Sequence, residues 1–475
     1  MVNFLLSFIV IPIFEMCSKT KFWTLYRHMC CSIEHFNSNN KNAELKLVKI
    51  IQNANENTLY WPSQISQDPH QSIENLLSSI PISHKVTYAQ GFPDQVTVNN
   101  IEKDDWQYLS SAGTTGRMTV VVDFEKRDYL RAAEHLNLKL ATGTAFGLKS
   151  VDIPPSACNV VCGFADQGPE SLWSYLFWAI KNNRMFLPET LSDLRGRFER
   201  QLMLKREVLL PVDSAPWEQM CAQLDNYLNH ILENKIRIIR ALPHFLLWLA
   251  KRAEQRKMHF PHVQTILPYG GLAGDVLVRF VCEIFQAKYV NVYGTGEVGS
   301  IGCALDDTQV ISIYDEMVCL EVIDEDDNPV MLNTPGRVVV TDLNNFAMPI
   351  IRYDIGDVAE VIELKEGTHL PKKIRVLGRR QECLDLPSGK CVSPVELQDL
   401  FFQFEGIVNF KIEQLTASMF KVSVVSIDAF DQEVLARQLQ NLLELLNPPV
   451  IKLSEFILPE QSGKFMSVKA KARKA

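Results

Sequence analysis

The feature of this 475-residue sequence that most constrains its fold is a repeated alternation of short apolar runs with longer helical patterns. The apolar runs have the length and composition of strands and lie at 207–211, 236–239, 265–267 and 289–293. Between them lie stretches of helical period at 216–233, 243–256 and 274–286. Short strands that alternate with helices of this length predict a layered α/β domain with much parallel sheet.

The pattern changes from about residue 310, where short alternating strands are joined by turns rich in Asp, Asn, Pro and Gly. This change predicts an antiparallel β subdomain, and the last 95 or so residues read as a compact α+β unit. The predicted fold class is therefore α/β, with a large N-terminal domain of layered sheets and helices and a small mobile C-terminal domain. The predicted boundaries are 1–377 for the large domain (helical lead-in 1–84, β subdomain 310–377), 378–382 for a hinge and 383–475 for the lid.

Composition limits the possible functions. Hydrophobic residues make up 47% and charged residues 22% of the chain, which suits a globular protein with a large core. The net charge of −8 disfavours a general nucleic-acid-binding protein, which needs a basic face. The 11 cysteines include no CxxC pair, so neither zinc-like spacing nor a disulfide framework is indicated. We expect reduced thiols and a cytoplasmic protein.

An apolar run at residues 4–14 is too short to cross a bilayer, which takes about 20 residues. No basic segment precedes it and no small-residue cleavage site follows, so a signal peptide is not indicated. We expect no integral membrane insertion. Packing against the body of the protein is the default interpretation, and peripheral membrane contact is the alternative.

A loop rich in glycine and hydroxyl groups carries the first chemical signal. It contains Ser111, Gly113, Thr114, Thr115 and Gly116. Backbone N–H groups in such a loop can form a concave anion site, to which the hydroxyls add donors. A β-branched run follows the loop, which predicts a turn between two strands, and the Lys-Ser/Thr pair of a P-loop is missing. Taken alone, the loop is as well explained by a surface turn.

Four further segments are weak signals singly and are informative because of their order along the chain. Tyr293 and Glu297 follow an apolar strand and offer a stacking ring and a hard oxygen ligand. Asp357, predicted at the start of a strand, could accept hydrogen bonds from two ribose hydroxyls, although a simple Asx turn is the favoured explanation when this segment is taken alone. Arg379 lies at the predicted hinge. Lys464, on a predicted flexible loop, could stabilise negative charge on a transferring group.

Together, these segments resemble the adenylate-forming superfamily of acyl-CoA synthetases, peptide-synthetase adenylation domains and luciferases. The matching segments, in chain order, are SAGTTGRMT, YGTGE, RYDIGD, GR followed by SPVE, and SGK. Thr119 at the place of the loop lysine, LPSGK after the hinge and the Arg352-Tyr353 start are similar to the phenylacetate–CoA ligase and CapK-like branch. The resemblance runs from about residue 85 to 468.

The resemblance implies a two-step reaction. A carboxylic acid attacks the α-phosphate of ATP and gives an acyl-adenylate and pyrophosphate, after which coenzyme A or a separate acyl carrier protein takes the acyl group. An aryl or other ring-bearing acid is favoured by the branch. The cofactor and substrate set is therefore ATP, Mg²⁺ and coenzyme A, and the oligomeric state is left open. Two other interpretations remain: an acyl transferase between coenzyme A and a carrier protein, and a non-catalytic nucleotide-binding protein.

The resemblance also assigns roles to residues. The loop residues named above would hold the phosphates, with Thr114 among the catalytic groups, and Tyr293 would lie against adenine. Glu297 would bind Mg²⁺, Asp357 with Arg379 would hold the ribose, and Lys464 would bridge carboxylate and α-phosphate. Further nucleotide-binding candidates are Gly271, Asn291, Gly294 and Thr295, and the acyl-site candidates are Phe164, His244 and Gly270. A His in an apolar helix, such as His244, is more often a core residue than an active-site group.

The sequence departs from the family pattern at several positions. Met118 replaces the loop proline, and Gln381 and Glu382 replace the acids expected after the hinge Gly-Arg pair. Relatives in this branch carry a zinc site made by a Cys and a His after the YGxxE element. Cys303 is present, but residues 309–314 contain no His, so we predict no zinc.

Overall fold

The computed structural model describes most of the chain. The described residues are 11–12, 15, 20–34, 41–65, 73–100, 107–111, 118–145, 147–154, 171–185, 194, 196–209, 214–305, 308–416, 418–460 and 463–470. The chain forms two compact units, each made of two separate stretches. Unit 1 comprises Met1–Ala145 with Val290–Arg380, and unit 2 comprises Phe146–Tyr289 with Gln381–Ala475.

The first stretch of unit 2 contains the predicted parallel sheet, which is confirmed. Its strands are β3 (Ser150–Ile153), β4 (Arg206–Val208), β5 (Ile238–Ala241), β6 (Thr265–Pro268) and β7 (Lys288–Tyr289). They are ordered β4-β3-β5-β6-β7, and every pair is parallel. The helices of this stretch are α9 (Leu172–Lys181), α11 (Trp217–Glu233), α12 (Pro243–Gln255) and α13 (Asp275–Phe285).

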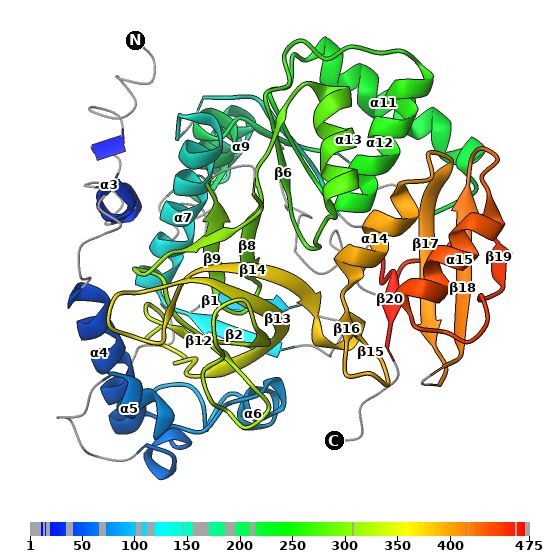
Figure 1. The fold of residues 1–475 in the computed structure, drawn as a ribbon. Coiled ribbons are helices and arrows are strands. Elements are labelled where there is room, and N and C mark those ends of the chain that lie inside the picture. The colour runs from blue at the N-terminus through cyan, green and yellow to red at the C-terminus, as the bar shows by residue number, and fades with distance from the viewer. Residues whose placement is uncertain are drawn as a thin grey trace. The chain divides into compact units, whose positions relative to one another are not determined.

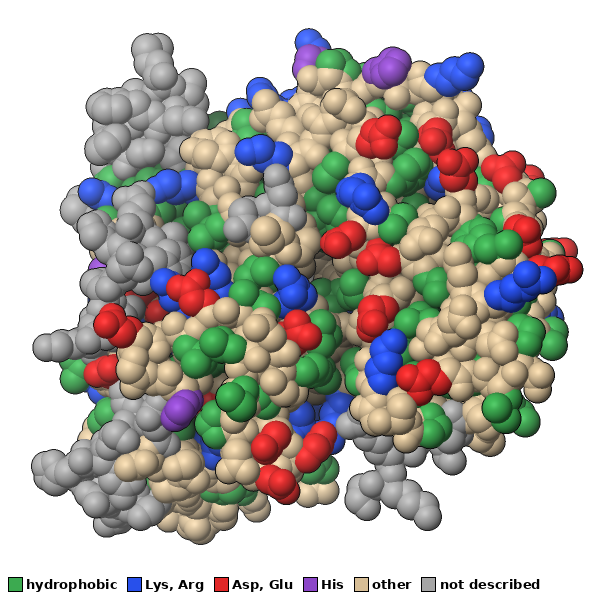
Figure 2. Space-filling model, viewed as in Figure 1, with side chains coloured by type: hydrophobic (Ala, Val, Ile, Leu, Met, Phe, Trp, Pro, Cys, Tyr) green, Lys and Arg blue, Asp and Glu red, His purple; other side chains and the backbone are tan. Residues whose placement is uncertain are grey.

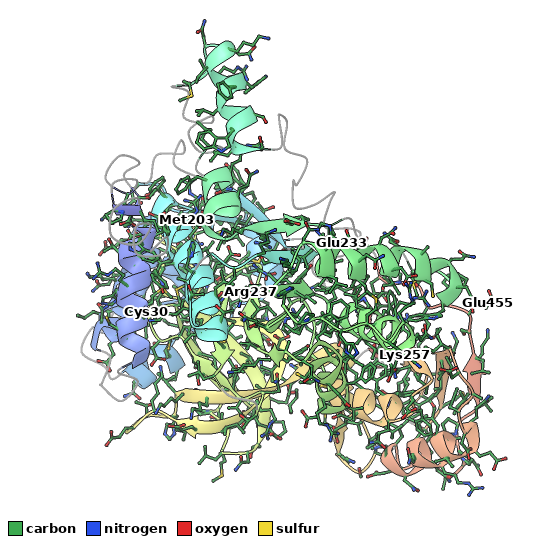
Figure 3. The ribbon with its side chains drawn as sticks, turned by 90° about the horizontal axis from the view of Figure 1, so that it is seen from above. Cys30, Met203, Glu233, Arg237, Lys257 and Glu455 are labelled. Atoms are coloured by element: carbon green, nitrogen blue, oxygen red, sulfur yellow. The ribbon has the colours of Figure 1, made fainter. Side chains whose placement is uncertain are left out.

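The helices of this stretch bury one apolar side against the sheet. α11, α12 and α13 lie together beside β6 (Figure 1), and their apolar residues form one core with the strands. Ile239 of β5 and Leu246 of α12 are fully buried in it. Glu233 ends α11 and Arg237 precedes β5 (Figure 3). The apolar residues that these helices bury are the physical basis of the sequence pattern.

The second stretch of unit 2 is the predicted α+β unit. Its elements are β15 (Leu384–Asp385), β16 (Cys391–Val392), α14 (Pro394–Phe402), β17 (Ile407–Gln414), β18 (Phe420–Ser426), α15 (Gln432–Leu442), β19 (Ile451–Leu453) and β20 (Val468–Lys469). Four strands form a mixed sheet in the order β19-β18-β17-β20. Phe401 and Phe410 stack in its own core with ring centroids 4.0 Å apart. This sheet also contacts the first stretch, since the Trp248 indole donates to the Val408 carbonyl at 3.0 Å.

Unit 1 begins with helices and a hairpin. Its helices are α3 (Phe22–Glu34), α4 (Lys41–Asn57), α5 (Ile73–Ser78), α6 (Lys85–Gly91) and α7 (Phe124–Thr142). The hairpin pairs β1 (Gln107–Ser111) with β2 (Met118–Val122) in antiparallel register. α7 starts directly after β2, because the Asp123 side chain accepts a hydrogen bond from the Lys126 N–H at 2.7 Å and caps the helix.

The second stretch of unit 1 is a seven-stranded antiparallel sheet. Its strands are β8 (Val292–Thr295), β9 (Gly299–Ala304), β10 (Ile311–Ile313), β11 (Val318–Ile323), β12 (Pro335–Asp342), β13 (Tyr353–Leu364) and β14 (Pro371–Arg379). Their order is β11-β12-β13-β14-β10-β9-β8. The antiparallel architecture is confirmed, and the sheet begins at Val292, earlier than the expected change of pattern near residue 310.

This sheet curls strongly. Tyr293 on the edge strand β8 donates a hydrogen bond to Asp357 on β13, although β9, β10 and β14 lie between them in the strand order. In a flat sheet these strands would be about 19 Å apart, at roughly 4.8 Å per strand, far beyond the reach of a tyrosine. The curl therefore brings the edge strand β8 close to strand β13.

Two strand predictions are wrong in detail. Residues 289–293 do not form one strand, because β7 ends at Tyr289 in the parallel sheet and β8 starts at Val292 in the antiparallel sheet. The YGTGE segment therefore belongs to an antiparallel hairpin and not to the carboxyl end of a parallel strand. Asp357 does not begin a strand but lies within β13, where backbone pairing on both sides extends the strand back to Tyr353.

Charges of both signs are interspersed over the described surface in Figure 2, and the face shown carries no large area of one sign. Among the described helices, none combines the length and the apolar character needed to span a membrane.

Candidate functional site

The strands around the glycine-rich loop form the predicted hairpin. β1 and β2 pair from Gln107 opposite Val122 to Ser111 opposite Met118, so the loop leaves and re-enters the hairpin at adjacent positions. Strand β2 is buried along most of its length. The loop residues themselves, Gly113, Thr114, Thr115 and Gly116, lie outside the described residues, as does the side chain of Ser111. The prediction that the loop joins two strands is confirmed, and the role of the loop residues in phosphate binding stays a prediction.

Tyr293, Asp357 and Arg379 come together in unit 1. The Tyr293 hydroxyl donates to Asp357 Oδ2 at 2.8 Å, and Arg379 Nε lies 3.0 Å from Asp357 Oδ1. Asp357 and Arg379 are directly opposite each other on β13 and β14, which places their side chains on one face. Burial and the Asp357 carboxylate raise the pKa of Tyr293 well above its usual value, so its hydroxyl remains a donor.

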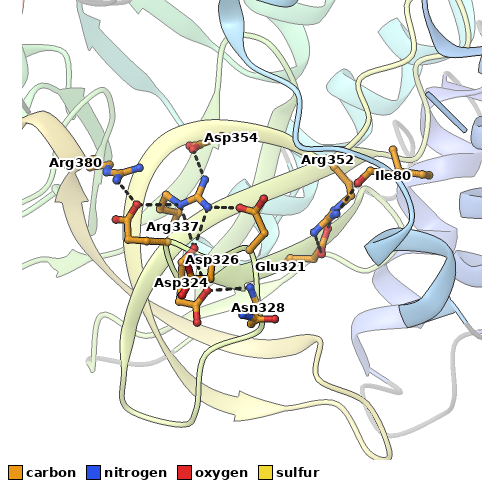
Figure 4. Close-up of polar contacts among 11 residues, drawn as sticks. Ile80, Glu321, Asp324, Asp326, Asn328, Arg337, Arg352, Asp354 and Arg380 are labelled. Carbon is orange, nitrogen blue, oxygen red and sulfur yellow. Dashed lines mark hydrogen bonds and ion pairs between the residues drawn. The ribbon is translucent and has the colours of Figure 1, made fainter. Parts of the chain in front are cut away.

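The carboxylates of Asp357 and of its motif neighbour Asp354 contact different residues. Asp354 Oδ2 pairs with Arg337 at 3.1 Å, and Asp354 Oδ1 accepts from the Gly356 N–H at 2.8 Å, so Asp354 is a structural residue (Figure 4). The motif's first residue is structural as well, since Arg352 pairs with Glu321 at 2.9 Å. Asp357 instead contacts Tyr293 and Arg379, which are both predicted site residues.

Glu297 sits in the turn of the β8–β9 hairpin. Its Oε1 lies 3.3 Å from the ammonium of Lys85, at the start of α6. Burial, and next the Glu297 carboxylate, raise the pKa of Tyr353, which places Glu297 near the start of β13. The hairpin has an irregular register at Gly294, where a Cβ would collide with the Gly299 carbonyl oxygen. Gly294 is therefore required by the close approach of the two strands.

Lys464 in unit 2 belongs to a tight turn. The Glu460 N–H donates to the Lys464 carbonyl at 2.9 Å, and the Gly463 N–H donates to the Glu460 carbonyl at 2.8 Å. Gly463 has a φ of 74°, which favours glycine. The Lys464 side chain lies against Gly270, where an added Cβ would be 3.2 Å from Lys464 Cε and 3.4 Å from Nζ. Two predicted site residues, Lys464 and Gly270, are thus neighbours.

Aromatic packing holds this turn. Phe465 lies edge-on to His244 with ring centroids 4.2 Å apart, and to Trp248 at 5.4 Å. His244 is the second residue of α12, which starts at Pro243. Burial lowers the pKa of His244 to about 3, so its imidazole is neutral at physiological pH. The described part of the chain supplies no hydrogen-bond partner to this ring, which separates His244 from a hydrogen-bonded core histidine.

The remaining predicted residues are placed as follows. Asn291 precedes β8 and its carbonyl accepts from Ala304 N–H at 2.9 Å, Thr295 Oγ1 accepts from Val298 N–H at 3.2 Å, and Gly271 follows Gly270 near Pro243. Phe164 lies outside the described residues. Their roles in ligand binding stay predictions.

Cys303 is buried in β9, and burial raises the pKa of its thiol to about 11. A thiol with this pKa is protonated at neutral pH and is a poor metal ligand. Within the described part of the chain, no group of three or more His, Cys, Asp and Glu side chains is placed to hold a metal ion.

Sequence reasoning missed Lys85 and Phe465. Lys85 is a single lysine at the start of a short helix, and nothing in its local pattern indicates the contact with Glu297. Phe465 follows Lys464 directly, and an aromatic residue beside a predicted catalytic lysine is a signal that could have been used. The hydrogen bond between Tyr293 and Asp357 depends on the curl of the sheet, which a linear pattern does not contain.

Comparisons with known proteins agree with this architecture. A 2-hydroxyisobutyryl-CoA ligase in complex with an acyl-AMP matches 92% of this chain and 90% of its own, with a TM-score of 0.65 and 14% identity. The same ligase in an open conformation matches with a TM-score of 0.54 and 14% identity over 91% of both chains. The amide bond synthetase McbA from Marinactinospora thermotolerans matches with a TM-score of 0.52 and 14% identity over 79% of this chain and 69% of its own.

Searches by sequence give no match: no family model matches this chain, and neither does any curated protein. At 14% identity, the structural likeness shows a shared fold. This chain therefore shares the fold of these solved structures, and the predicted α/β fold class is confirmed.

Proposed function

We propose that this protein activates a carboxylic acid with ATP to form an acyl-adenylate and pyrophosphate, and then transfers the acyl group to a thiol. The observation that carries the proposal is the geometry at Asp357. Its motif neighbours Arg352 and Asp354 pair with Glu321 and Arg337, whereas Asp357 is a buried carboxylate in contact with Tyr293 and Arg379, which the motifs also assign to the nucleotide site. This geometry supports binding of a ribose.

In the first step, a carboxylate oxygen of the acid forms a bond to the α-phosphorus. The bond from that phosphorus to the bridging oxygen breaks, and pyrophosphate leaves with the electron pair. Lys464 would bridge the carboxylate and the α-phosphate and stabilise the charge that develops between them. Its neighbour Gly270 has no side chain, and an added Cβ there would crowd the Lys464 side chain.

Mg²⁺ fits the residues present. Mg²⁺ is commonly bound by one or two carboxylates together with substrate phosphates and waters, and Glu297 offers one such carboxylate at a hairpin turn. The bound ion would offset phosphate charge. Lys85, 3.3 Å from Glu297, adds a second positive charge in a chain whose loop lysine is replaced by Thr119. We propose that Lys85 contributes to phosphate binding.

In the second step, a thiol sulfur attacks the acyl carbonyl, its proton goes to solvent, and AMP leaves. We propose coenzyme A or a separate carrier protein as the acceptor and the cytoplasm as the place of action. We further propose a ring-bearing acid, because Phe465, which directly follows Lys464, packs against Trp248 and against the neutral ring of His244. The phenylacetate–CoA ligase and CapK-like branch remains our proposal on the motif variants at Thr119 and 386–390.

The test is acid-dependent release of pyrophosphate from MgATP, with hydroxylamine to trap the adenylate, over a panel of aryl, alkyl and amino acids. We expect release and hydroxamate formation with ring-bearing acids. Acyl transfer between coenzyme A and a carrier protein without ATP would instead identify a transferase. MgATP binding without turnover of any acid would contradict the proposal and leave a nucleotide-binding protein.

A further inference from the structure

A fully buried ion pair in unit 1 connects segments that carry the proposed nucleotide site. Lys126 on α7 pairs with Asp342 at the end of β12, and its ammonium lies 2.8 Å from Oδ1 and 2.6 Å from Oδ2. The two side chains are 1% and 0% exposed. None of the recognised motifs contains either residue.

Lys126 also holds the hairpin that carries Glu297. Its ammonium donates to the Val298 carbonyl at 2.8 Å, one residue after Glu297. Asp342 in turn accepts from the Asn344 N–H at 3.0 Å. Lys126 therefore links the β8–β9 turn to the segment that follows β12, and both ends of the link are buried.

The segment around Asp342 reaches the other nucleotide motifs as well. Asn345 donates through Nδ2 to the Val121 carbonyl at 3.0 Å, on the strand that leaves the glycine-rich loop. Thr341 Oγ1 accepts from the Arg352 N–H at 3.0 Å, at the start of the RYDIGD motif. Residues 341–345 thus contact the elements of two motifs directly and reach the third through Lys126, which makes this segment a common support for the site.

Stability alone does not account for the pair. Removing two charges from water costs several kcal/mol per ion, and well-packed neutral residues in place of a buried ion pair are often no less stable. The hydrogen bond from Lys126 to Val298, however, requires a long side chain with a donor at its end. The specific contribution of Lys126 is therefore the position of the Val298 carbonyl and of the turn before it.

We propose that the Lys126–Asp342 pair positions the β8–β9 turn for MgATP binding, an inference that rests on the proposed function. Lys126 is a positioning residue, since it acts through the Val298 backbone. The pair fixes the turn before the ligand arrives, so its loss lowers nucleotide affinity without requiring loss of the fold.

The test compares the wild type with the variant Lys126→Met/Asp342→Asn. This variant removes both charges together and keeps an oxygen for the Asn344 N–H, so no single buried charge is left. We expect its melting temperature to stay within a few degrees of the wild type, with a Kd for MgATP at least tenfold weaker by calorimetry. In acid-dependent pyrophosphate release, KM for ATP should rise more than kcat falls.

The matched control is Lys46→Met/Glu316→Gln, which removes a largely buried ion pair of the same unit. Lys46 touches Asn344 but neither Val298 nor Val121, so this variant should lose thermal stability and keep its MgATP affinity within twofold. If the first variant does not fold, Lys126→Arg is tested in its place. This change keeps Asp342 paired but moves the donor away from the Val298 carbonyl, and MgATP binding is expected to weaken.

Amide hydrogen exchange provides a readout that needs no nucleotide. The peptide spanning 292–300 should exchange faster in Lys126→Met/Asp342→Asn than in the wild type, while a peptide from α12 stays unchanged. Wild-type MgATP affinity and wild-type exchange in this variant would overturn the positioning role while leaving the proposed function intact. A wild type that exchanges as expected but does not bind MgATP would overturn the proposed function.

Discussion

The two regions that carry the candidate site hold their key side chains in different ways. In unit 1, Asp357 is fixed by a tyrosine hydroxyl at 2.8 Å and an arginine at 3.0 Å, so hydrogen bonds and charge define its position. In unit 2, Lys464 is placed by a tight turn and by its neighbour Phe465, which packs on His244 and Trp248. The first arrangement is polar and directional, and the second is a short turn seated on an aromatic surface.

This difference teaches how the two regions respond to change. A directional polar network fails when one partner is removed, because a buried group is then left without its hydrogen bond. An apolar contact tolerates a substitute of similar size and fails in proportion to the surface that is lost. Given the roles proposed for Asp357 and Lys464, substitutions at Asp357 in unit 1 should act on nucleotide binding. Substitutions around Lys464 in unit 2 should act on the rate of the chemical step.

The largest effect is expected for Lys464→Ala. Loss of a group that stabilises charge in the transition state costs about 10²–10³ in rate, so acid-dependent pyrophosphate release should fall by that factor while the Kd for MgATP changes little. The control is Lys452→Ala, an exposed lysine of the same unit. Equal loss of MgATP affinity and rate in Lys464→Ala would break the proposed division between the regions.

Asp357→Asn tests the polar side of the comparison. Hydrogen bonds to charged groups are worth about 1.5–3 kcal/mol, so MgATP binding should weaken by about ten- to a hundredfold when measured by calorimetry. Glu360→Gln, on the same strand and paired with Arg375, serves as control and should bind as the wild type does. An Asp357→Asn variant with wild-type affinity would remove the ribose-binding role.

Phe465→Ala tests the apolar side. Aromatic contacts contribute about 0.5–1.5 kcal/mol each, and 1.4 kcal/mol corresponds to a factor of about ten, so kcat for adenylation should fall by about tenfold. KM for ATP should change less than twofold, and Phe465→Leu should recover part of the rate. Phe456→Ala, at an exposed position of the same tail, is the control. A rise in KM for ATP without a fall in kcat would contradict the anchoring role.

The last test, His244→Gln, concerns stability rather than activity, and its effect depends on pH. The pKa of His244 is about 3 in the folded protein and about 6.5 when unfolded. Below pH 6.5 the unfolded state binds a proton that the folded state refuses, so this group lowers the wild-type free energy of unfolding by up to about 1.4 kcal/mol per pH unit. The loss of stability grows as the pH falls from about 6.5 to about 3, stays constant below pH 3 and is absent above pH 7.

Urea unfolding between pH 7 and pH 4 measures this prediction. The acid-induced loss of stability should be smaller in His244→Gln than in the wild type. His262→Gln, at an exposed position, should follow the wild type. Parallel pH dependences for all three proteins would show that the His244 ring is not held in its neutral form.

The fold was largely predictable because its signals are local. The alternation of strands and helices between 205 and 289 reflects one buried side per helix, and the structure follows it closely. The capping box of Ser393, Pro394 and Glu396 is likewise set by local sequence and starts α14. The split of 289–293 was missed because a run of β-branched and aromatic residues does not show where a chain leaves one sheet and enters another.

The candidate site was predictable only in part. Motifs identify Asp357 and Arg379, and their cross-strand pairing follows from the register of β13 and β14. The contacts of Lys85 with Glu297 and of Lys126 with Val298 and Asp342 join residues more than 170 positions apart. Such contacts arise from tertiary packing, which one sequence without its structure does not specify.

The most direct test of the proposed chemistry is the fate of oxygen from the acid. The acid selected by the panel is labelled with ¹⁸O in both carboxylate oxygens, and AMP is isolated after transfer to the thiol. Attack on the α-phosphorus predicts one ¹⁸O atom in each AMP and none in pyrophosphate. Label in inorganic phosphate with formation of ADP, or unlabelled AMP, would contradict an acyl-adenylate and with it the proposed function.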